Sequence, residues 1–487
     1  MLEVLNRITE GKGVMEDIAL IEELAVGMAN NSLCALGQLT PGPVLSALRY
    51  FREEFETHIL EKRCPAGTCK DLVRAPCVNS CPAGVDVPSY LSLVSEGKYA
   101  QGLAIHRKRN PFALVCGRIC PAFCEKRCRR GDLDEPIAIR QIKRFMADQE
   151  IKNPWTPPLL EANKGQKVAI IGSGPAGLTA ALRLAQWGYQ VTVFEALSVA
   201  GGMMAIGIPE YRLPRDILQA EIDNVRRAGV EIKLNSRLGR DFTIDELMDR
   251  QGFSSVVMAI GAHNSRSLRI PGEERDGVWG GTDFLRRVAL GDKPDLTGKR
   301  VAVVGGGNTA IDAARTALRL GAASVNLVYR RTREEMPAEA LEIHEAEEEG
   351  IKMTFLANPS RVIGVDKVEG LELVMQDLGE FDDSSRRRPM PIAGSEYVLP
   401  VDIILPAIGQ STDVTCADSC GITFNRNTTI KVDRKLCTTR PGVFAAGDAV
   451  LGPATVIEAV AQGNQSAMMV DEFLQKGEEA SKESWLD

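Results

Sequence analysis

The stretch that decides the fold is KVAIIGSGPAGLTAALRLAQWGYQVTVFEA, residues 167–196. A run of apolar, β-branched residues leads into a glycine-rich turn, an apolar helical pattern follows, and a second β-branched run ends in an acid. That order predicts a strand, a tight turn, a helix and a second strand, which together make a βαβ unit. The glycines of the turn are spaced G-x-G-x-x-G, at Gly172, Gly174 and Gly177.

This glycine spacing predicts a dinucleotide site. The first glycine permits the tight turn, the second lets the backbone approach a pyrophosphate, and the third allows the helix to pack closely on the strand. The anion would face the N-terminus of the helix, near Pro175 and Ala176. Glu195 ends the second strand, where a carboxylate can accept a hydrogen bond from a ribose hydroxyl. Because strand, helix and acid are all in place, we expect a bound dinucleotide here.

A second unit of the same design occupies residues 299–331, KRVAVVGGGNTAIDAARTALRLGAASVNLVYRR. Its second strand ends in Arg330 and Arg331, where the first unit has an acid. Guanidinium groups bind a 2′-phosphate bidentately, whereas an acid would repel it. We therefore expect NADP(H) here and not NAD(H), the alternative being a solvated basic loop. The turn of this unit contains Gly305, Gly307, Asn308, Thr309 and Ala310.

Length and charge limit the classes of protein to consider. The 487 residues suffice for roughly three domains. A net charge of −7 gives no sign of a nucleic-acid partner. No apolar run approaches the roughly 18 residues that cross a bilayer, and the start, MLEVLNRITEGKG, lacks the pattern of a signal peptide. We therefore expect a cytoplasmic protein with no membrane span and no nucleic-acid partner.

Cysteines are concentrated in one part of the chain. In a reducing compartment, clustered thiols are more often metal or redox ligands than disulfides. Two [4Fe–4S] clusters need about eight ligands, mostly thiolates. Zinc is the main alternative, and inert structural thiols are the other. Of the twelve cysteines, eight lie within residues 64–128: Cys64, Cys69, Cys77, Cys81, Cys116, Cys120, Cys124 and Cys128.

The late stretch PGVFAAGDAV, residues 441–450, places Asp448 after Gly447 at a predicted strand end. A chain that combines this stretch with the two glycine-rich units resembles the two-dinucleotide-binding-domain flavoproteins. The resemblance implies FAD on the first unit, with Asp448 at the ribityl chain, and the nicotinamide nucleotide on an inserted domain. The implied fold is α/β with two Rossmann-like domains, an FAD-binding domain at 166–298 and 400–487 and an NADP(H)-binding domain at 299–399.

Three further stretches narrow the resemblance: GGMMAIGIPEYRLP (201–214), YRRTREEMPA (329–338) and GPATVIEAVAQG (452–463). They resemble the small subunit of NADPH-dependent glutamate synthase and its relatives, which include the NADPH-binding subunit of electron-bifurcating transhydrogenases and the N-terminal half of dihydropyrimidine dehydrogenase. The likeness covers about residues 63–487. It implies further cofactor contacts at Gly202, Arg212, Leu213, Gly261, Gly409, Thr455 and Ala459.

The same resemblance implies how the thiols divide between two clusters. Cys64, Cys69, Cys77 and Cys128 would hold one centre, and Cys81, Cys120 and Cys124 would supply three ligands of the other. Relatives often use a Glu or Gln as the last ligand, but Lys143 stands there, and an ammonium group has no lone pair to offer. Cys116 is the substitute that we expect, with Gln141 as the weaker candidate. The spacing also departs from the C-x₂-C-x₄-C of relatives, because here it is C-x₄-C-x₇-C.

The N-terminal tract carries a second resemblance. SLCALGQLTPGPVLSALRYFREEFETHILEKRCPAGTC, residues 32–69, resembles the C-terminal end of the NADH-binding flavoprotein subunit of respiratory complex I and its counterpart in bifurcating hydrogenases. Cys34 matches only the last cluster ligand of that family, so it is either a relic or completes a cluster with a partner chain. An apolar face, expected to be helical, comprises Val44, Leu48, Phe51, Phe55 and Ile59.

We therefore expect a helical docking segment at 1–62, a helical iron–sulfur domain at 63–150 and a linker at 151–165 before the two nucleotide domains. The leading hypothesis is the NADP(H) subunit of an electron-bifurcating NADH/ferredoxin:NADP oxidoreductase complex. Its partners would be a complex I-type flavoprotein, a thioredoxin-like iron–sulfur subunit and ferredoxin. The alternatives are a glutamate synthase small subunit and a non-catalytic electron-relay scaffold.

Overall fold

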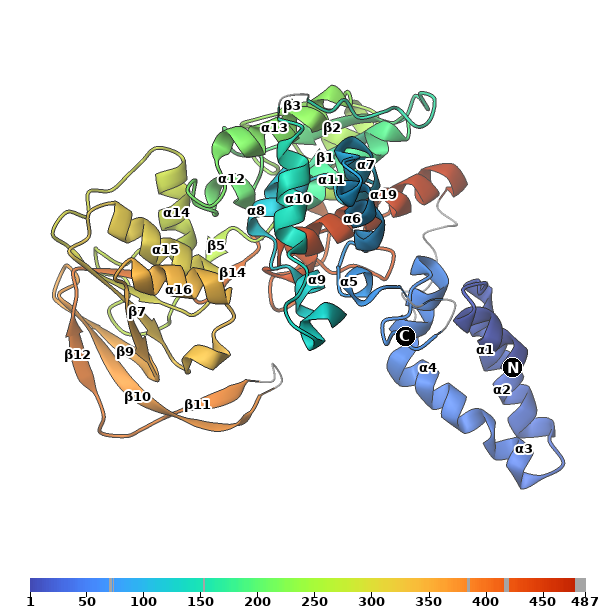
Figure 1. Cartoon of the computed structure of the whole chain (residues 1–487), viewed down its shortest axis with the longest axis horizontal. Helices are drawn as coiled ribbons and strands as arrows, with labels where there is room; N and C mark the ends of the chain where they lie inside the picture. The colour runs from blue at the N-terminus through green and yellow to red at the C-terminus, as the bar shows by residue number, and fades with distance from the viewer. Residues whose placement is uncertain (70–71, 73, 152–153, 383–385, 416–419, 478–487) are drawn as a thin grey trace. The chain divides into compact units, whose positions relative to one another are not determined.

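A computed structural model describes the chain except for residues 70–71, 73, 152–153, 383–385, 416–419 and 478–487 (Figure 1). Residues 152–153 of the expected linker are thus outside the described residues. The chain divides into two compact units. Unit 1 comprises residues 1–109 and 122–146, and unit 2 comprises residues 110–121 and 147–487. Among the helices that the structure describes, none is long and apolar enough to cross a membrane.

Unit 1 is helical, which confirms the expectation for the N-terminal iron–sulfur region. Its helices are α1 (Leu2–Thr9), α2 (Glu16–Asn31), α3 (Ala35–Leu39), α4 (Pro41–Glu56), the π-helical turn η1 (Thr57–Glu61), α5 (Pro76–Asn79), α6 (Val87–Ser95), α7 (Tyr99–Arg107), α9 (Phe123–Lys126), the 3₁₀ turn η3 (Arg129–Asp132) and α10 (Ile139–Asp148), whose last two residues are in unit 2.

The first helices of unit 1 share a small apolar core, in which Leu48 and Ile59 pack beside α1 and α2. Val44 and Phe55 pack against the edge of that core. The fifth residue of the predicted face does not join it. Phe51 is 58% exposed and has non-helical dihedral angles (φ −131°, ψ 29°), so the prediction of a continuous apolar face was wrong at this residue. The kink turns the ring away from the stripe that a straight helix would form.

Unit 2 contains the predicted βαβ units as two parallel sheets (Figure 1). The first has the order β15-β4-β1-β2-β3, and the second has the order β13-β6-β7-β8. Their central strands are almost wholly buried, as parallel strands covered on both faces are. The strands of the first sheet are β1 (Lys167–Ile171), β2 (Gln190–Phe194), β3 (Glu231–Lys233), β4 (Phe253–Met258) and β15 (Val443–Ala445); those of the second are β6 (Arg300–Val304), β7 (Ser324–Tyr329), β8 (Lys352–Phe355) and β13 (Ile403–Pro406).

The pairing explains how distant segments meet. Strand β15 pairs with β4, which returns the C-terminal region to the first sheet. Strand β13 pairs with β6, so the second sheet extends to residues 403–406. An antiparallel sheet follows β8, with β9 (Ala357–Ile363), β10 (Gly370–Phe381), β11 (Arg387–Pro391) and β12 (Tyr397–Pro400). The short pair β5 (Asn264–Ser265) and β14 (Gln410–Ser411) completes the strands.

Helices pack against the sheets, and two of these helices cross each other closely. Helix α11 (Pro175–Gln186) packs against α19 (Val456–Lys476), and a Cβ on Gly463 would lie 2.5 Å from the carbonyl oxygen of Ala176. Only a residue without a Cβ permits that close crossing. The other helices of unit 2 are α8 (Ala113–Ile119), α12 (Met203–Ile206), α13 (Arg215–Arg227), η4 (Glu246–Arg250), α14 (Gly281–Ala289), α15 (Asn308–Arg319), η5 (Arg333–Glu335), α16 (Ala340–Glu348) and α18 (Asp448–Leu451).

A buried carboxylate fixes the helix that carries Cys116. Glu221 on α13 is 1% exposed, and its two oxygens accept hydrogen bonds from the backbone N–H groups of Leu114 (2.8 Å) and Val115 (3.0 Å). These groups lie in the first turn of α8 and have no partner within the helix. Glu221 therefore holds the segment that leads to Cys120 against α13.

We expect Glu221→Ala to loosen residues 110–121, because it leaves two buried N–H groups without their charged acceptor. A loss of about 2–3 kcal/mol in the free energy of local opening corresponds to roughly 30- to 150-fold faster amide exchange in that segment. Hydrogen exchange read by mass spectrometry measures it, with Asp223→Ala on the exposed face of α13 as the matched control. Equal exchange of residues 110–121 in the two variants would contradict this role for Glu221.

Candidate functional site

A cavity of about 240 Å³ lies at the carboxyl ends of β1, β2, β4 and β15. In open α/β sheets, ligands bind at this edge, outside the ends of the strands. The segments that line it come from distant parts of the chain, among them those around residues 172, 195, 260 and 448. Of the predicted cofactor contacts, the lining includes Gly172, Gly174, Pro175, Ala176, Glu195, Gly202, Gly261, Gly447, Asp448, Thr455 and Ala459.

The glycine turn has the geometry that the sequence predicts. Gly172 has φ +105°, and a Cβ there would lie 2.3 Å from the carbonyl oxygen of Ala259. A Cβ on Gly177 would lie 2.1 Å from the carbonyl oxygen of Gly172, so a glycine at this position lets the helix pack closely against the turn. A Cβ on Gly174 would meet no atom within 4 Å, because that face of the turn opens on the cavity. The turn therefore fits a pyrophosphate at the N-terminus of α11.

Glu195 is buried and holds the turn from the end of β2. Its Oε2 accepts hydrogen bonds from the backbone N–H (2.9 Å) and the hydroxyl (2.5 Å) of Ser173, and its Oε1 accepts one from the N–H of Leu197 (2.9 Å). Carboxylate oxygens have further lone pairs. Glu195 can thus accept a hydrogen bond from a ribose while it keeps the turn in place.

Asp448 lies at the opposite wall, in the first turn of α18. Burial raises the pKa of its carboxyl group to about 7, against a hydrogen bond from the backbone of Ala454 that lowers it. Near neutral pH this residue can therefore donate as well as accept a hydrogen bond. That behaviour suits a hydroxyl-rich ligand, so the residues at this edge fit the predicted FAD.

We expect Asp448 to give the flavin-free protein a pH-dependent stability. The folded protein keeps the proton up to about pH 7, whereas an unfolded chain releases it near pH 3.9. Folding therefore takes up a proton between these limits, and stability falls as pH rises from about 4 to 7. Thermal unfolding of flavin-stripped protein should show a shallower decline in Asp448→Asn than in wild type or in the exposed control Asp366→Asn. Parallel curves for all three proteins would contradict the shifted pKa.

Some predicted contacts lie elsewhere. Arg212 forms an ion pair with Asp312 on α15 (2.7 Å) and another with Glu342 on α16 (2.8 Å). Leu213 is fully buried, and Gly409 packs beside the side chain of Arg266. Arg212 thus connects the segment after α12 to the helices of the second sheet, and it does not line the cavity described above.

The cavity also contains side chains that sequence reasoning missed. His263 and Arg286 line it near Gly261, and Arg237 lines it together with Asp413, to which it is ion-paired at 2.6 Å. Burial and the nearby Arg286 lower the pKa of His263, which favours its neutral form. His263, Arg237 and Asp413 lie in loops beyond the strand ends, and Arg286 lies on α14. They belong to no motif with regular spacing, so sequence reasoning could not find them.

The second glycine turn has the same construction. Gly305 has φ +144°, and a Cβ there would lie 2.3 Å from the carbonyl oxygen of Ala407. Gly307 is the N-cap of α15, and Thr309 lies in the first turn. The side chain of Asn308 accepts a hydrogen bond from the N–H of Glu339 (3.0 Å), which holds the loop before α16 close to the turn.

The two arginines at the end of β7 have different roles. Arg331 is 2% exposed, forms an ion pair with Asp382 (2.5 Å) and donates to the carbonyl oxygen of Arg387 (2.7 Å). Arg330 is exposed and makes no hydrogen bond or ion pair to any residue that the structure describes. Partial burial lowers its pKa, and the neighbouring Arg331 and Arg386 lower it further. A cation without a carboxylate partner, beside two other guanidinium groups, suits a phosphate ligand.

None of the eight clustered cysteines forms a disulfide with a residue that the structure describes. Cys77 lies on α5, which packs against α9, and Cys128 is near enough to contribute to a raised pKa of Cys77, of which burial is the main cause. Cys124 lies on α9 itself. Cys81 follows α5 in unit 1, whereas Cys116 and Cys120 are part of unit 2. The donor set, soft sulfur without disulfides, fits iron–sulfur centres.

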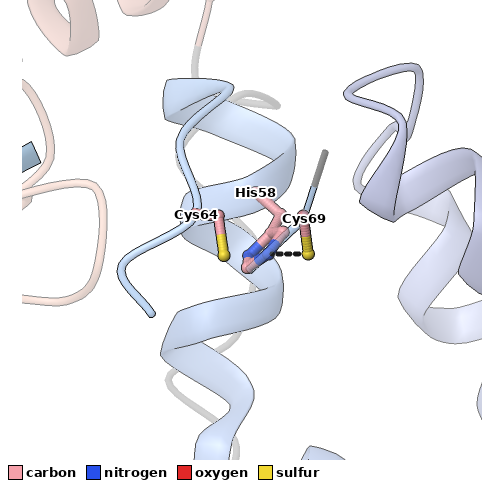
Figure 2. A group of neighbouring side chains, drawn as sticks. All are labelled: His58, Cys64 and Cys69. Atoms are coloured by element: carbon pink, nitrogen blue, oxygen red, sulfur yellow. Dashed lines mark hydrogen bonds between the residues drawn. The ribbon is translucent and has the colours of Figure 1, made fainter. Parts of the chain in front are cut away.

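Cys64 and Cys69 lie beside a histidine that had not been expected. Their Sγ atoms and a ring nitrogen of His58 all lie within 4.8 Å of one another (Figure 2). Across the residues that the structure describes, this is the one group of three or more His, Cys, Asp or Glu side chains with such spacing. Spacing rules do not predict it, because His58 lies in the π-helical turn η1 and the two cysteines follow in an irregular segment.

Comparison with protein families agrees with the geometry. Residues 166–463 match the family of pyridine nucleotide-disulphide oxidoreductases. Residues 49–155 match domain II of dihydropyrimidine dehydrogenase, described as a 4Fe-4S cluster domain. Residues 1–58 match the NADH-ubiquinone oxidoreductase-F iron-sulfur binding region. The two resemblances expected from the sequence are thereby confirmed.

Individual relatives extend the match over the whole chain. The NADP(+)-dependent formate dehydrogenase subunit beta of Moorella thermoacetica is 42% identical, over 99% of this chain and 78% of its own. The glutamate synthase [NADPH] small chain of Halomonas elongata is 33% identical, over 89% of this chain and 95% of its own. The FprA His57Gln mutant of Mycobacterium tuberculosis has the same fold over 65% of this chain and 86% of its own, with a TM-score of 0.58 and 20% identity.

These matches favour an enzyme over a non-catalytic scaffold and confirm the α/β fold, with a helical iron–sulfur region that precedes it in the sequence. The chain belongs to the pyridine nucleotide-disulphide oxidoreductase family and is an NAD(P)H-dependent FAD oxidoreductase with 4Fe-4S regions.

Proposed function

We propose that the chain is the NADP(H)-binding subunit of a multi-subunit, cytoplasmic oxidoreductase. FAD, when bound at the first sheet, would exchange a hydride with NADPH at the second sheet and exchange single electrons with the iron–sulfur centres. The observation that carries this proposal is the pair of glycine turns in unit 2. The strand β2 of the first βαβ unit leads into Glu195, and the strand β7 of the second leads into Arg330, which makes no hydrogen bond or ion pair with a described residue. The protein supplies position and electrostatics for both nucleotides.

In this proposal, separate groups of residues bind FAD, NADPH and the iron–sulfur centres. The turn at Gly172–Gly177 and Glu195 would hold the FAD pyrophosphate and ribose, and Asp448 would meet its ribityl chain. Gly305, Gly307 and the N-terminus of α15 would hold the NADPH pyrophosphate, with Arg330 at the 2′-phosphate. Of the clustered thiols, the six from Cys77 to Cys128 would ligate the iron–sulfur centres, and the assignment of all eight to two clusters stays a prediction. Electrons would leave through these centres to partner subunits.

The partners that we propose are those of a bifurcating, complex I-like assembly: a complex I-type flavoprotein, a thioredoxin-like iron–sulfur subunit and ferredoxin. Support comes from residues 1–58, which match the iron–sulfur region of a complex I subunit, and from a relative that is itself a subunit beta. A second candidate is the small subunit of a glutamate synthase, which the match to such a chain over 95% of its length favours.

Anaerobic titration of the purified full chain with NADPH tests the hydride step. We expect one equivalent of NADPH to bleach the flavin absorption, and NADH to do so only at much higher concentration. Failure of NADPH to bleach bound FAD would overturn the proposal. Proteins that co-purify separate the two candidates: a complex I-type flavoprotein supports the first, and a glutamine-cleaving large subunit supports the second.

A further inference from the structure

His58, Cys64 and Cys69 form a compact group inside unit 1 (Figure 2). His58 and Cys64 are buried, with 8% and 1% of their surface exposed, and Cys69 is half-buried. The distance from His58 Nε2 to Cys69 Sγ is 3.2 Å. The group therefore places three metal-binding side chains in a site that is largely closed to water.

The tautomer of His58 follows from its other ring nitrogen. Nδ1 lies 2.6 Å from the carbonyl oxygen of Glu54, and a carbonyl oxygen can only accept a hydrogen bond. Nδ1 must therefore carry a proton, which leaves the Nε2 lone pair of the neutral ring directed at the two sulfur atoms. Metal-binding histidines are oriented in this way, by donation from the second nitrogen to a backbone carbonyl.

The backbone around His58 is unusual as well. His58 lies in the π-helical turn η1, which extends α4 and ends at Lys62 in the left-handed region (φ 49°). Single π-helical turns are rare and occur frequently at functional sites. The amino group of Lys62 donates to the carbonyl oxygen of Gly13 (2.8 Å), which ties this end of the helix to the N-terminal segment. The turn thus has a fixed place from which the ring reaches the two thiols.

The spacing of the three ligand atoms distinguishes one metal ion from a cluster. Around one tetrahedral zinc ion, with bonds of about 2.3 Å to sulfur and about 2.0 Å to nitrogen, neighbouring ligand atoms stand roughly 3.5–3.8 Å apart. In a [4Fe–4S] cluster each thiolate binds a different iron atom, so its ligands stand further apart. Three atoms that are mutually within 4.8 Å match the single ion.

We propose that His58, Cys64 and Cys69 bind one zinc ion, through Nε2 and the two Sγ atoms, as a site separate from the iron–sulfur centres. The fourth position belongs to water or to a donor outside this group. The site accounts for the C-x₄-C-x₇-C spacing, because the first two cysteines then serve a different metal from Cys77. Six of the eight clustered thiols remain, so two all-cysteine clusters, which need eight, cannot both form.

Metal analysis of the full chain, purified without added zinc and without chelator, tests the proposal. We expect close to one zinc per chain. His58→Ala should lose the zinc, because removal of a ligand lowers the affinity by more than the roughly tenfold that follows removal of an outer hydrogen-bond partner. His58→Cys should retain the zinc, since a thiolate is also a zinc ligand. The controls His344→Ala and Cys34→Ser change an exposed histidine and an exposed cysteine and should leave the zinc content unchanged.

Replacement of zinc by Co²⁺ tests the site in the wild-type protein, so the result does not depend on whether a variant folds. Wild-type protein reconstituted with Co²⁺ should show the intense absorption of tetrahedral cobalt bound to thiolates, and added zinc should abolish it. Absence of zinc together with a lower iron content or an altered iron–sulfur EPR spectrum in His58→Ala would overturn the proposal and assign the group to a cluster. Flavin bleaching by NADPH is independent of either result, so failure here is distinguishable from failure of the proposed function.

Discussion

Arg330→Ala is expected to weaken NADPH binding by roughly 10- to 100-fold and to change NADH binding by less than about twofold. A charge-assisted hydrogen bond contributes about 1.5–3 kcal/mol, and NADH lacks the 2′-phosphate that would receive it. Arg330 is the residue to change because it makes no hydrogen bond or ion pair to a described residue. Titration of protein fluorescence with each nucleotide under anaerobic conditions measures both affinities.

Two further variants give this experiment its control. Arg361→Ala removes an exposed guanidinium from β9, where it is paired with Glu372, and should change neither affinity. Arg331→Ala breaks a buried ion pair with Asp382 and should lower thermal stability and both affinities, because Arg331 holds the end of β7 to Asp382 and Arg387. Equal losses of NADPH and NADH binding in Arg330→Ala would show that its side chain does not meet the 2′-phosphate.

Asp312→Ala is expected to lower the free energy of unfolding of unit 2 by about 3 kcal/mol, because it leaves the buried Arg212 without its main partner. The two residues meet through contacts of 2.9 and 2.7 Å, and Asp312 is 4% exposed. Burial raises the pKa of Asp312, and the Arg212 guanidinium opposes this shift. The pair connects the segment after α12 with α15, and therefore the FAD side of the unit with the NADP(H) side.

A double-mutant cycle separates the pair from its surroundings. Arg212→Met combined with Asp312→Ala removes both charges and should recover most of the stability lost in Asp312→Ala. Thermal unfolding of unit 2 gives the stabilities, and the rate of flavin reduction by NADPH gives the effect on domain alignment. Additive losses in the double variant would contradict a coupling between these side chains.

Local patterns predicted the parts of the structure that depend on local conformation. The turn at Gly172 and its counterpart at Gly305 require a positive φ and close backbone contacts, which few residues other than glycine permit. The same patterns failed where the chain departs from a regular helix. Phe51 has the right spacing for the apolar face, but the kink in α4 exposes it.

Contacts between distant segments could not be predicted in this way. Arg212 was expected at a cofactor, but its partner Asp312 stands 100 residues further along the chain. Arg330 and Arg331 look equivalent in sequence, and the structure distinguishes them because Asp382, just after β10, pairs with Arg331. His58 joins Cys64 and Cys69 across the end of a π-helical turn, a geometry that no spacing rule describes.

The central claim is that electrons pass from NADPH through FAD to iron–sulfur centres within this chain. Rapid-freeze EPR spectroscopy of the full, FAD-loaded protein after anaerobic mixing with NADPH tests it most directly. We predict that the signal of a reduced iron–sulfur centre appears after the flavin bleaches, and that it is absent in flavin-stripped protein until dithionite is added. A signal that dithionite produces but NADPH does not, in FAD-loaded protein whose flavin has bleached, would contradict the account.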